Sequence, residues 1–147
     1  MNHPGDWFCT GFCKLVSASP GTWYNCAMLE TRESRAMIMV HSRPVIEPHR
    51  KSGWELVLWT GNAFDHSTPF REMLTEIAAV LNQEAPASVE LPGYDASEDD
   101  VEGVLRFGDD EIGIYYEHSL SYLSLRSDSA ITLHRIADRL QPLVALA

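Results

Sequence analysis

Cysteine is scarce in this sequence and odd in number, with three residues in all. A secreted scaffold held by disulfides normally uses an even number of cysteines, so these thiols are expected to stay reduced. The spacings between Cys9, Cys13 and Cys26 lack the paired C-x2-C pattern of a zinc ribbon. We predict buried thiols and no metal, and the less favoured alternative is a zinc site completed by His3 or His41.

Long apolar runs and a secretory signal are also missing. The longest apolar runs are only a few residues, far short of the roughly 20 that a membrane helix needs. The first residues, MNHPGDW, do not combine basic residues with an apolar stretch as a signal peptide does. We therefore expect a cytoplasmic protein. Its 147 residues, 45% of them hydrophobic, predict a single α+β domain over residues 1–147.

Catalytic motifs are the third absence. The chain has no glycine-rich phosphate loop, no G-x-S-x-G elbow and no H-E-x-x-H helix, and its six histidines show no metal-ligand spacing. Glu117, His118 and Ser119 offer a base beside a nucleophile, but adjacent residues of a strand point to opposite faces. We predict a hairpin corner there, no enzyme and no cofactor. A small hydrolase that uses His118 remains the alternative.

Positive charge is scarce in one segment. Residues 90–117 contain ten acidic residues and one base, a net charge of -9, whereas the whole chain has 21 acids, 11 bases and a net charge of -10. Phosphate contacts require lysine and arginine, so direct nucleic-acid binding is disfavoured, and an anionic membrane would repel this segment. A basic protein is the electrostatic complement. We call residues 90–117 the acidic segment.

The spacing of apolar residues indicates an antiparallel sheet with two helices on one face. Residues 68–85 predict a helix with Thr68 as cap, Pro69 at its first position and Pro86 beyond its end. A second helix is expected from Ser127 or Asp128 to about Leu140. Strands are expected at 7–16, 23–30, 36–42, 54–60, 101–107, 111–117 and 120–126, with a hairpin link at 31–35 and loops at 43–53 and 92–100.

In two predicted strands, the alternation of residues assigns the side chains to opposite faces of the sheet. Ile112, Ile114 and Tyr116 share one face of the strand 111–117, and Glu111, Gly113, Tyr115 and Glu117 share the other. In the strand 54–60, Leu56 and Leu58 should point inward, which makes Trp59 the best candidate for an exposed tryptophan. An exposed aromatic with a polar rim is a binding anchor.

The acidic segment is therefore the candidate binding surface, because tyrosines accompany its carboxylates and tyrosine is enriched at protein interfaces. Asp95, Glu98, Asp99 and Asp100 do not match a calcium-binding loop, so Ca²⁺ or Mg²⁺ is the less favoured interpretation. The residues predicted to bind a partner are Tyr94, Asp95, Glu98, Asp99, Asp100, Glu102, Asp109, Asp110, Glu111, Tyr115 and Glu117.

The C-terminal stretch VEGVLRFGDDEIGIYYEHSLSYLSLRSDSAITLHRIADRL resembles the strand-strand-strand-helix ending of some bacterial immunity proteins. These proteins neutralise polymorphic toxins, including those of contact-dependent growth inhibition. The likeness covers about residues 100–140 and rests on pattern and acidity, so no signature residue is transferred. It implies a cytoplasmic inhibitor that binds one cognate toxin domain, often a nuclease. A secretion chaperone or adaptor is a further alternative, and the choice between monomer and dimer stays open.

Overall fold

A six-stranded sheet is the centre of the computed structural model, which describes residues 38–62 and 68–147. The strand order is β2-β3-β7-β6-β5-β4, and each neighbouring pair is antiparallel. The strands are β2 Val45–Pro48, β3 Trp54–Trp59, β4 Ala87–Glu90, β5 Asp100–Phe107, β6 Asp110–Glu117 and β7 Tyr122–Ser127. Together with the two helices, this sheet confirms the predicted α+β class.

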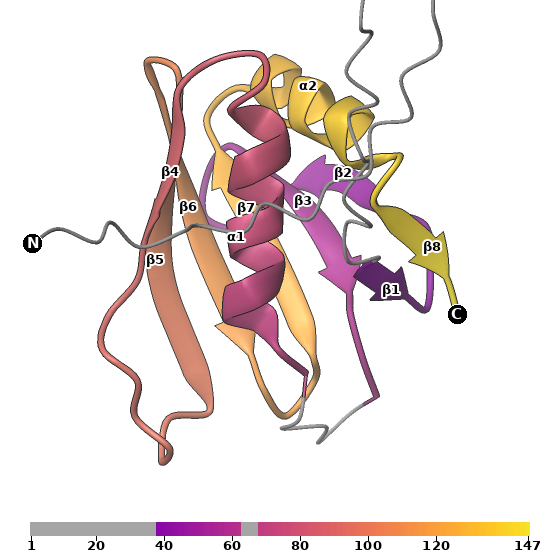
Figure 1. The fold of residues 1–147 in the computed structure, drawn as a ribbon, viewed down its shortest axis with the longest axis vertical. Coiled ribbons are helices and arrows are strands. Elements are labelled where there is room, and N and C mark those ends of the chain that lie inside the picture. Colours follow the sequence, from indigo (N-terminus) through magenta and orange to yellow (C-terminus); the bar gives the residue numbers. More distant parts are fainter. Residues whose placement is uncertain (1–37, 63–67) are drawn as a thin grey trace, which may run out of the picture. The chain divides into compact units, whose positions relative to one another are not determined.

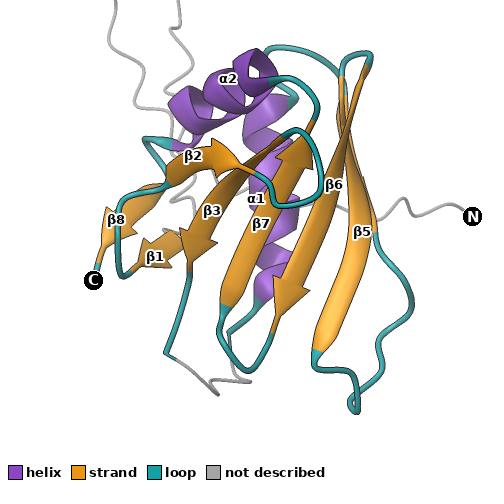
Figure 2. Ribbon diagram, turned by 180° about the vertical axis from the view of Figure 1, so that it is seen from behind, coloured by secondary structure: helices purple, strands orange, loops and turns teal. Residues whose placement is uncertain are grey.

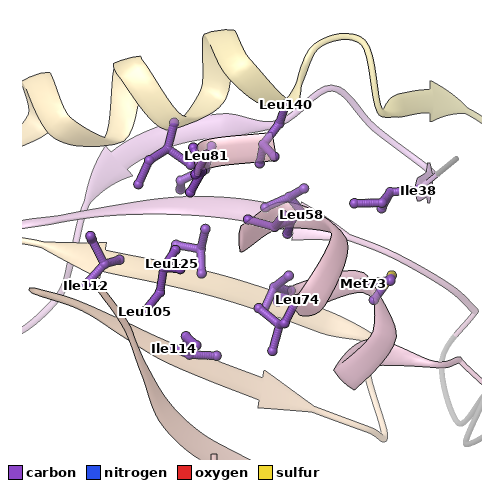
Figure 3. Close-up of a cluster of buried hydrophobic side chains, with 14 of the residues drawn as sticks. Ile38, Leu58, Met73, Leu74, Leu81, Leu105, Ile112, Ile114, Leu125 and Leu140 are labelled. Atoms are coloured by element: carbon purple, nitrogen blue, oxygen red, sulfur yellow. The ribbon is translucent and has the colours of Figure 1, made fainter. Parts of the chain in front are cut away.

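Both helices pack on one face of this sheet, as the sequence predicted (Figure 1). Helix α1 spans Phe70–Leu81 and helix α2 spans Ala130–Leu140. The apolar stripe of α1, from Phe70 to Leu81, is buried against the strands. Figure 3 shows side chains of both helices and of the central strands meeting in one core, among them Leu74, Leu140 and Leu125. None of the helices in the described ranges is long and apolar enough to cross a membrane.

The helix starts differ from the prediction. Pro69 occupies the N-cap position of α1 and no side chain caps that helix, so Thr68 does not have its predicted role. Proline lacks an N–H, so the first turn has one donor fewer to satisfy. In α2 the N-cap is Ser129, whose hydroxyl accepts the Thr132 N–H at 3.2 Å, one or two residues later than expected. Helix α1 ends at Leu81, before Pro86.

The three predicted strands of the C-terminal half form the meander β5-β6-β7. Gly108 and Asp109 connect β5 to β6, and Gly108 has a φ of 61°, a conformation that suits glycine. The connection from β6 to β7 contains four residues, 118–121, and not the predicted two. Ser121 ends it with a φ of 50° and is fully buried, and its carbonyl accepts both the N–H and the hydroxyl of Thr60. The longer turn therefore ties the start of β7 to the end of β3.

The predicted loop 43–53 is wrong in its first half, because Val45–Pro48 forms strand β2 at one edge of the sheet. Two prolines flank or end this strand, which is tolerated at an edge because one side of the backbone needs no partner. Gly53 closes the β2–β3 hairpin with a φ of 72°, and a Cβ there would lie 2.7 Å from the Ser127 carbonyl oxygen. This close approach explains why glycine ends the hairpin loop.

Three further strands are short, and two of them were not predicted. Strand β4 follows α1 and pairs with β5. Strands β1 (Ile38–Val40) and β8 (Val144–Leu146) form a separate two-stranded parallel sheet. Strand β1 lies within the predicted strand 36–42, whereas β4 and β8 have no counterpart in the prediction. The strands predicted at 7–16 and 23–30, the link 31–35 and the three cysteines lie outside the described residues, so the prediction of one domain over 1–147 stays a prediction.

Candidate partner-binding face

The face of the sheet opposite the helices is the candidate site, and we call it the open face. Figure 2 shows it from the front, with α1 lying behind the strands. Strand register places alternate side chains on it, from Glu55, Val57 and Trp59 of β3 across to Glu102 and Arg106 of β5. The remaining side chains on the four central strands are Asp100, Val104, Glu111, Tyr115, Glu117, Tyr122, Ser124 and Arg126.

One end of the open face holds three carboxylates, and we call Asp100, Glu102 and Glu117 the acidic end. Asp100 lies directly opposite Glu117 in the antiparallel register, and Glu102 lies opposite Tyr115. Like charges that face each other across two strands destabilise a sheet. No lysine or arginine among the described residues forms an ion pair with these three carboxylates. Within the described residues, the repulsion between these carboxylates is therefore not offset by an ion pair.

The predicted loop 92–100 continues the acidic end beyond the sheet, although its last residue, Asp100, already belongs to β5, so the loop is 92–99. Tyr94 is 78% exposed. The N–H and the hydroxyl of Ser97 donate to Asp95 and hold the pKa of that carboxyl below its usual value. Asp99 accepts the Ser119 N–H at 2.9 Å, and its carbonyl accepts the His118 N–H at 2.7 Å. Asp99 thus links the loop to the β6–β7 turn through two hydrogen bonds. Glu98 also lies in this loop and is exposed.

An aromatic row crosses the middle of the open face. The ring centroid of Tyr122 lies 4.9 Å from that of Trp59 and 6.3 Å from that of Tyr115. The Tyr115 hydroxyl donates to Glu117 at 3.2 Å. Burial, and then the Glu117 carboxylate, raise the pKa of Tyr115 to about 12. Trp59 is 38% exposed, which confirms the prediction that it is accessible, and Trp54 is equally exposed.

Glu55 is the one buried charged side chain in the described part of the chain, with 7% of its surface exposed. Its Oε2 atom accepts the hydroxyl of Tyr122 at 3.0 Å and that of Ser124 at 2.7 Å. Burial, and then this hydrogen bond to Glu55, raise the pKa of Tyr122. Arg126 lies opposite Glu55 in register, but its guanidinium sits 4.5 Å from the ring centroid of Tyr115. The buried carboxylate is therefore bound by neutral donors.

The other end of the acidic segment is different, and we call Glu90, Arg106, Asp110 and Glu111 the paired end. Arg106 lies 3.2 Å from Glu90 and 3.3 Å from Glu111, so one guanidinium serves two carboxylates. Asp110 lies on the helix side of β6 and accepts the Thr132 hydroxyl at 3.1 Å. Asp109 lies in the β5–β6 turn. The structure thus separates Asp109, Asp110 and Glu111 from the rest of the predicted binding residues.

The candidate catalytic trio does not converge. The His118 ring packs edge-on against Phe70 and Tyr116 on the helix side, with centroids 5.1 and 5.0 Å apart. The Ser119 hydroxyl donates to Glu117 at 2.9 Å on the open face. His118 thus points to the face opposite Glu117, as the alternation predicted, whereas Ser119 meets Glu117 on the open face. The described ranges 38–62 and 68–147 contain no group of three His, Cys, Asp or Glu residues that could hold a metal ion.

The open face also contains four residues that were not predicted to bind a partner, namely Glu55, Tyr122, Ser124 and Arg126. The alternation of Leu123 and Leu125 with polar neighbours was a signal for an outward-facing polar row on β7. The contact of this row with Glu55 joins residues 67 and 69 positions apart, and local sequence patterns do not reveal it.

No protein-family model, curated protein sequence or solved structure matches this chain.

Proposed function

We propose that this protein binds and neutralises a cognate basic toxin domain, as a cytoplasmic immunity protein does. The open face is the contact surface in this proposal, and the acidic end with the loop 92–99 attracts the partner. A nuclease toxin is one such basic domain, because its nucleic-acid site must itself be rich in lysine and arginine.

The observation that carries the proposal is the pairing of Asp100 with Glu117 on an open face beside three aromatic side chains. Like charges opposite each other lower the stability of the sheet. A cationic partner would relieve that repulsion on binding, while the aromatic row would supply anchors of low conformational entropy. The hydrogen-bonded sheet also holds these groups in place before the partner arrives.

Charge supports a basic protein over other partners. The acidic segment has a net charge of -9, which disfavours nucleic acid and anionic lipid headgroups alike. Electrostatic steering of a basic protein toward this surface would speed association by roughly 10- to 1,000-fold at low salt. The proposed cytoplasmic location accords with the odd number of cysteines.

The experiment uses the protein encoded by the reading frame immediately upstream, if that frame encodes a large secreted protein with a basic C-terminal domain. The purified C-terminal domain is titrated with this protein, and its toxicity is measured in cells with and without co-expression. We expect tight binding, protection of the cells and an association rate that falls steeply with salt. A neighbouring frame of metabolic function, or a toxin domain that does not bind, would remove the proposal.

Two triple variants then locate the surface, and each removes three negative charges. The test variant is Glu98→Gln, Asp100→Asn and Glu102→Gln, whose side chains make no hydrogen bond within the described residues. The control variant, on the helices, is Glu72→Gln, Glu76→Gln and Asp138→Asn. We expect the test variant to slow association at least about tenfold and the control variant less than about twofold. Equal effects would show that net charge, and not the open face, determines association.

A further inference from the structure

The aromatic row and Glu55 together have the parts of a receptor for a guanidinium group. This inference deepens the proposed function, because it rests on a basic partner and names the side chain that the partner inserts. It concerns the β3–β7 half of the open face, where Trp59 is the one residue that the sequence had marked as a candidate anchor and none of the predicted acidic binding residues lies.

Glu55 is the first observation. Its side chain is more than nine-tenths buried, yet the residues that bind it are the neutral hydroxyls of Tyr122 and Ser124, both at Oε2. No described residue donates a hydrogen bond to Oε1, and no described cation lies within ion-pair distance. A buried carboxylate without a cationic partner is costly to a fold. A role in binding a cation from a partner would explain why the sequence keeps a carboxylate at this buried position.

The second observation is the aromatic wall beside this carboxylate. The Tyr122 side chain contacts Trp59 with its ring and Glu55 with its hydroxyl, so it spans the distance between them. Trp59 keeps 38% of its surface exposed. Tryptophan and tyrosine faces attract cations, and the guanidinium group of arginine also stacks on them as a plane.

The third observation comes from the same face. Arg126 places its guanidinium 4.5 Å from the ring centroid of Tyr115, and its Nε atom donates to the Ser124 hydroxyl at 3.3 Å. This arginine combines stacking on a tyrosine with a hydrogen bond from the guanidinium. Arg126 of β7 therefore shows, on Tyr115 of the neighbouring β6, the kind of contact that an incoming arginine would make on Tyr122 of β7.

We propose that an arginine side chain of a basic partner stacks on Tyr122 beside Trp59 and donates a hydrogen bond to Oε1 of Glu55. Arginine fits better than lysine because the site offers a flat ring and a carboxylate edge together, which match a planar donor and not a point charge. In this proposal the acidic end attracts the basic partner at longer range, whereas Glu55 contacts the arginine side chain directly.

The experiment titrates the full chain with N-acetyl-arginine methylamide and follows amide and indole NMR signals. The citrulline analogue is the uncharged control of the same shape, and the lysine analogue tests the planar group. We expect saturable shifts at Trp59, Tyr122 and Glu55 with arginine, weaker shifts with lysine and none that saturate with citrulline. Binding of citrulline as tight as that of arginine, or the absence of saturation, would overturn the site, and equal binding of lysine would overturn the choice of guanidinium.

Two variants and one matched control assign the contact. Glu55→Gln should weaken arginine binding at least about tenfold, and Trp59→Ala, an exposed position, by about threefold. Glu47→Gln removes the same charge from the exposed residue opposite Glu55 on β2 and should cost less than about twofold. Equal losses in Glu47→Gln and Glu55→Gln would overturn direct contact. If Glu55→Gln does not fold, an unchanged affinity in Trp59→Ala overturns the proposal.

The two proposals fail separately. A toxin domain that binds, and that responds to Asp100 and Glu102 but not to Glu55, would remove the guanidinium site and keep the proposed function. Arginine binding that depends on Glu55, in a protein whose neighbouring frame encodes no toxin, would keep the site and remove the proposed function.

Discussion

Both ends of the acidic segment contain several carboxylates, but the interactions of these carboxylates within the fold differ. At the paired end, Arg106 forms ion pairs with Glu90 and Glu111, and Asp110 accepts a hydrogen bond from a hydroxyl of α2. At the acidic end, Asp100 faces Glu117 and no described cation pairs with either. The first set of carboxylates forms ion pairs and a hydrogen bond within the fold. In the second set Glu117 accepts the hydroxyls of Tyr115 and Ser119, but the two like charges that face each other are expected to lower the stability of the sheet. Negative charge that no cation of the described residues pairs with is available to a basic partner.

Substitutions of single groups at each end test whether the two ends differ in this way. The largest effect is expected for Asp110→Ala, because the buried Thr132 hydroxyl would lose its acceptor. An unsatisfied buried polar group costs about 1–3 kcal/mol, so the free energy of unfolding should fall by that amount. Urea unfolding followed by circular dichroism measures it.

Asp109→Ala is the matched control for that measurement. Asp109 is the neighbouring acid in the β5–β6 turn and is exposed. Its removal should change the free energy of unfolding by less than about 0.5 kcal/mol. If both variants lose the same stability, Asp110 has no special role in joining β6 to α2.

An effect of intermediate size is expected at alkaline pH. Burial and Glu117 raise the pKa of Tyr115 from 10.0 to about 12 in the folded protein. The stabilisation linked to this proton is complete below the unfolded value and is lost as the pH rises toward the folded value. Stability should therefore fall between about pH 10 and about pH 12, and Tyr115→Phe should flatten that decline. Unfolding curves at a series of pH values test this.

Tyr94→Phe is the control for the alkaline series, since Tyr94 is 78% exposed on the loop. It should follow the wild-type curve. A decline in Tyr115→Phe as steep as that of the wild type would mean that another group causes the alkaline loss.

A smaller effect of opposite sign is expected for Asp100→Asn. The change removes one of two like charges that face each other across β5 and β6 and breaks no hydrogen bond of the described side chains. Relief of such a pair is worth about 0.2–1 kcal/mol, so the variant should be more stable than the wild type. A loss of stability in thermal unfolding would show that the acidic end is not strained by its own charge.

The smallest effect is a difference in salt response. Added salt screens repulsion between exposed charges, with a screening length of about 10 Å at 0.1 M. The wild type should gain stability between about 0.05 M and about 0.5 M sodium chloride, and Asp100→Asn should gain less. Equal gains would place the repulsion elsewhere in the chain.

Much of the fold could be predicted from the sequence because the spacing of apolar residues in a long helix or strand can be recognised within that element alone. The stripe from Phe70 to Leu81 and the alternation of Ile112, Ile114 and Tyr116 each identify one buried face. Strands β2, β4 and β8 have three or four residues, too few to establish a period. Their existence depends on neighbours distant in the sequence, such as the pairing of β8 with β1.

The candidate site was only partly predictable, for a related reason. A count of charge treats Asp100 and Asp110 alike, although Asp110 lies on the same side of β6 as Ile112 and therefore faces the helices. The odd or even position of each residue along the strand would have shown which face its side chain occupies. Glu55 was not predictable in this way, because its burial depends on side chains from β7, 67 and 69 positions further along the chain.

The short edge strands have a consequence for behaviour at high concentration. Strands β2 and β4, which end the six-stranded sheet, have four residues each; Pro48 ends the first, and Glu90 ends the second shortly before Pro92. Proline offers no N–H to an incoming strand, and charge at an edge repels a second copy. The sheet thus gives little template for edge-to-edge aggregation. A protein that accumulates in excess of its binding partner would benefit from such blunt edges, since much of it would remain unbound.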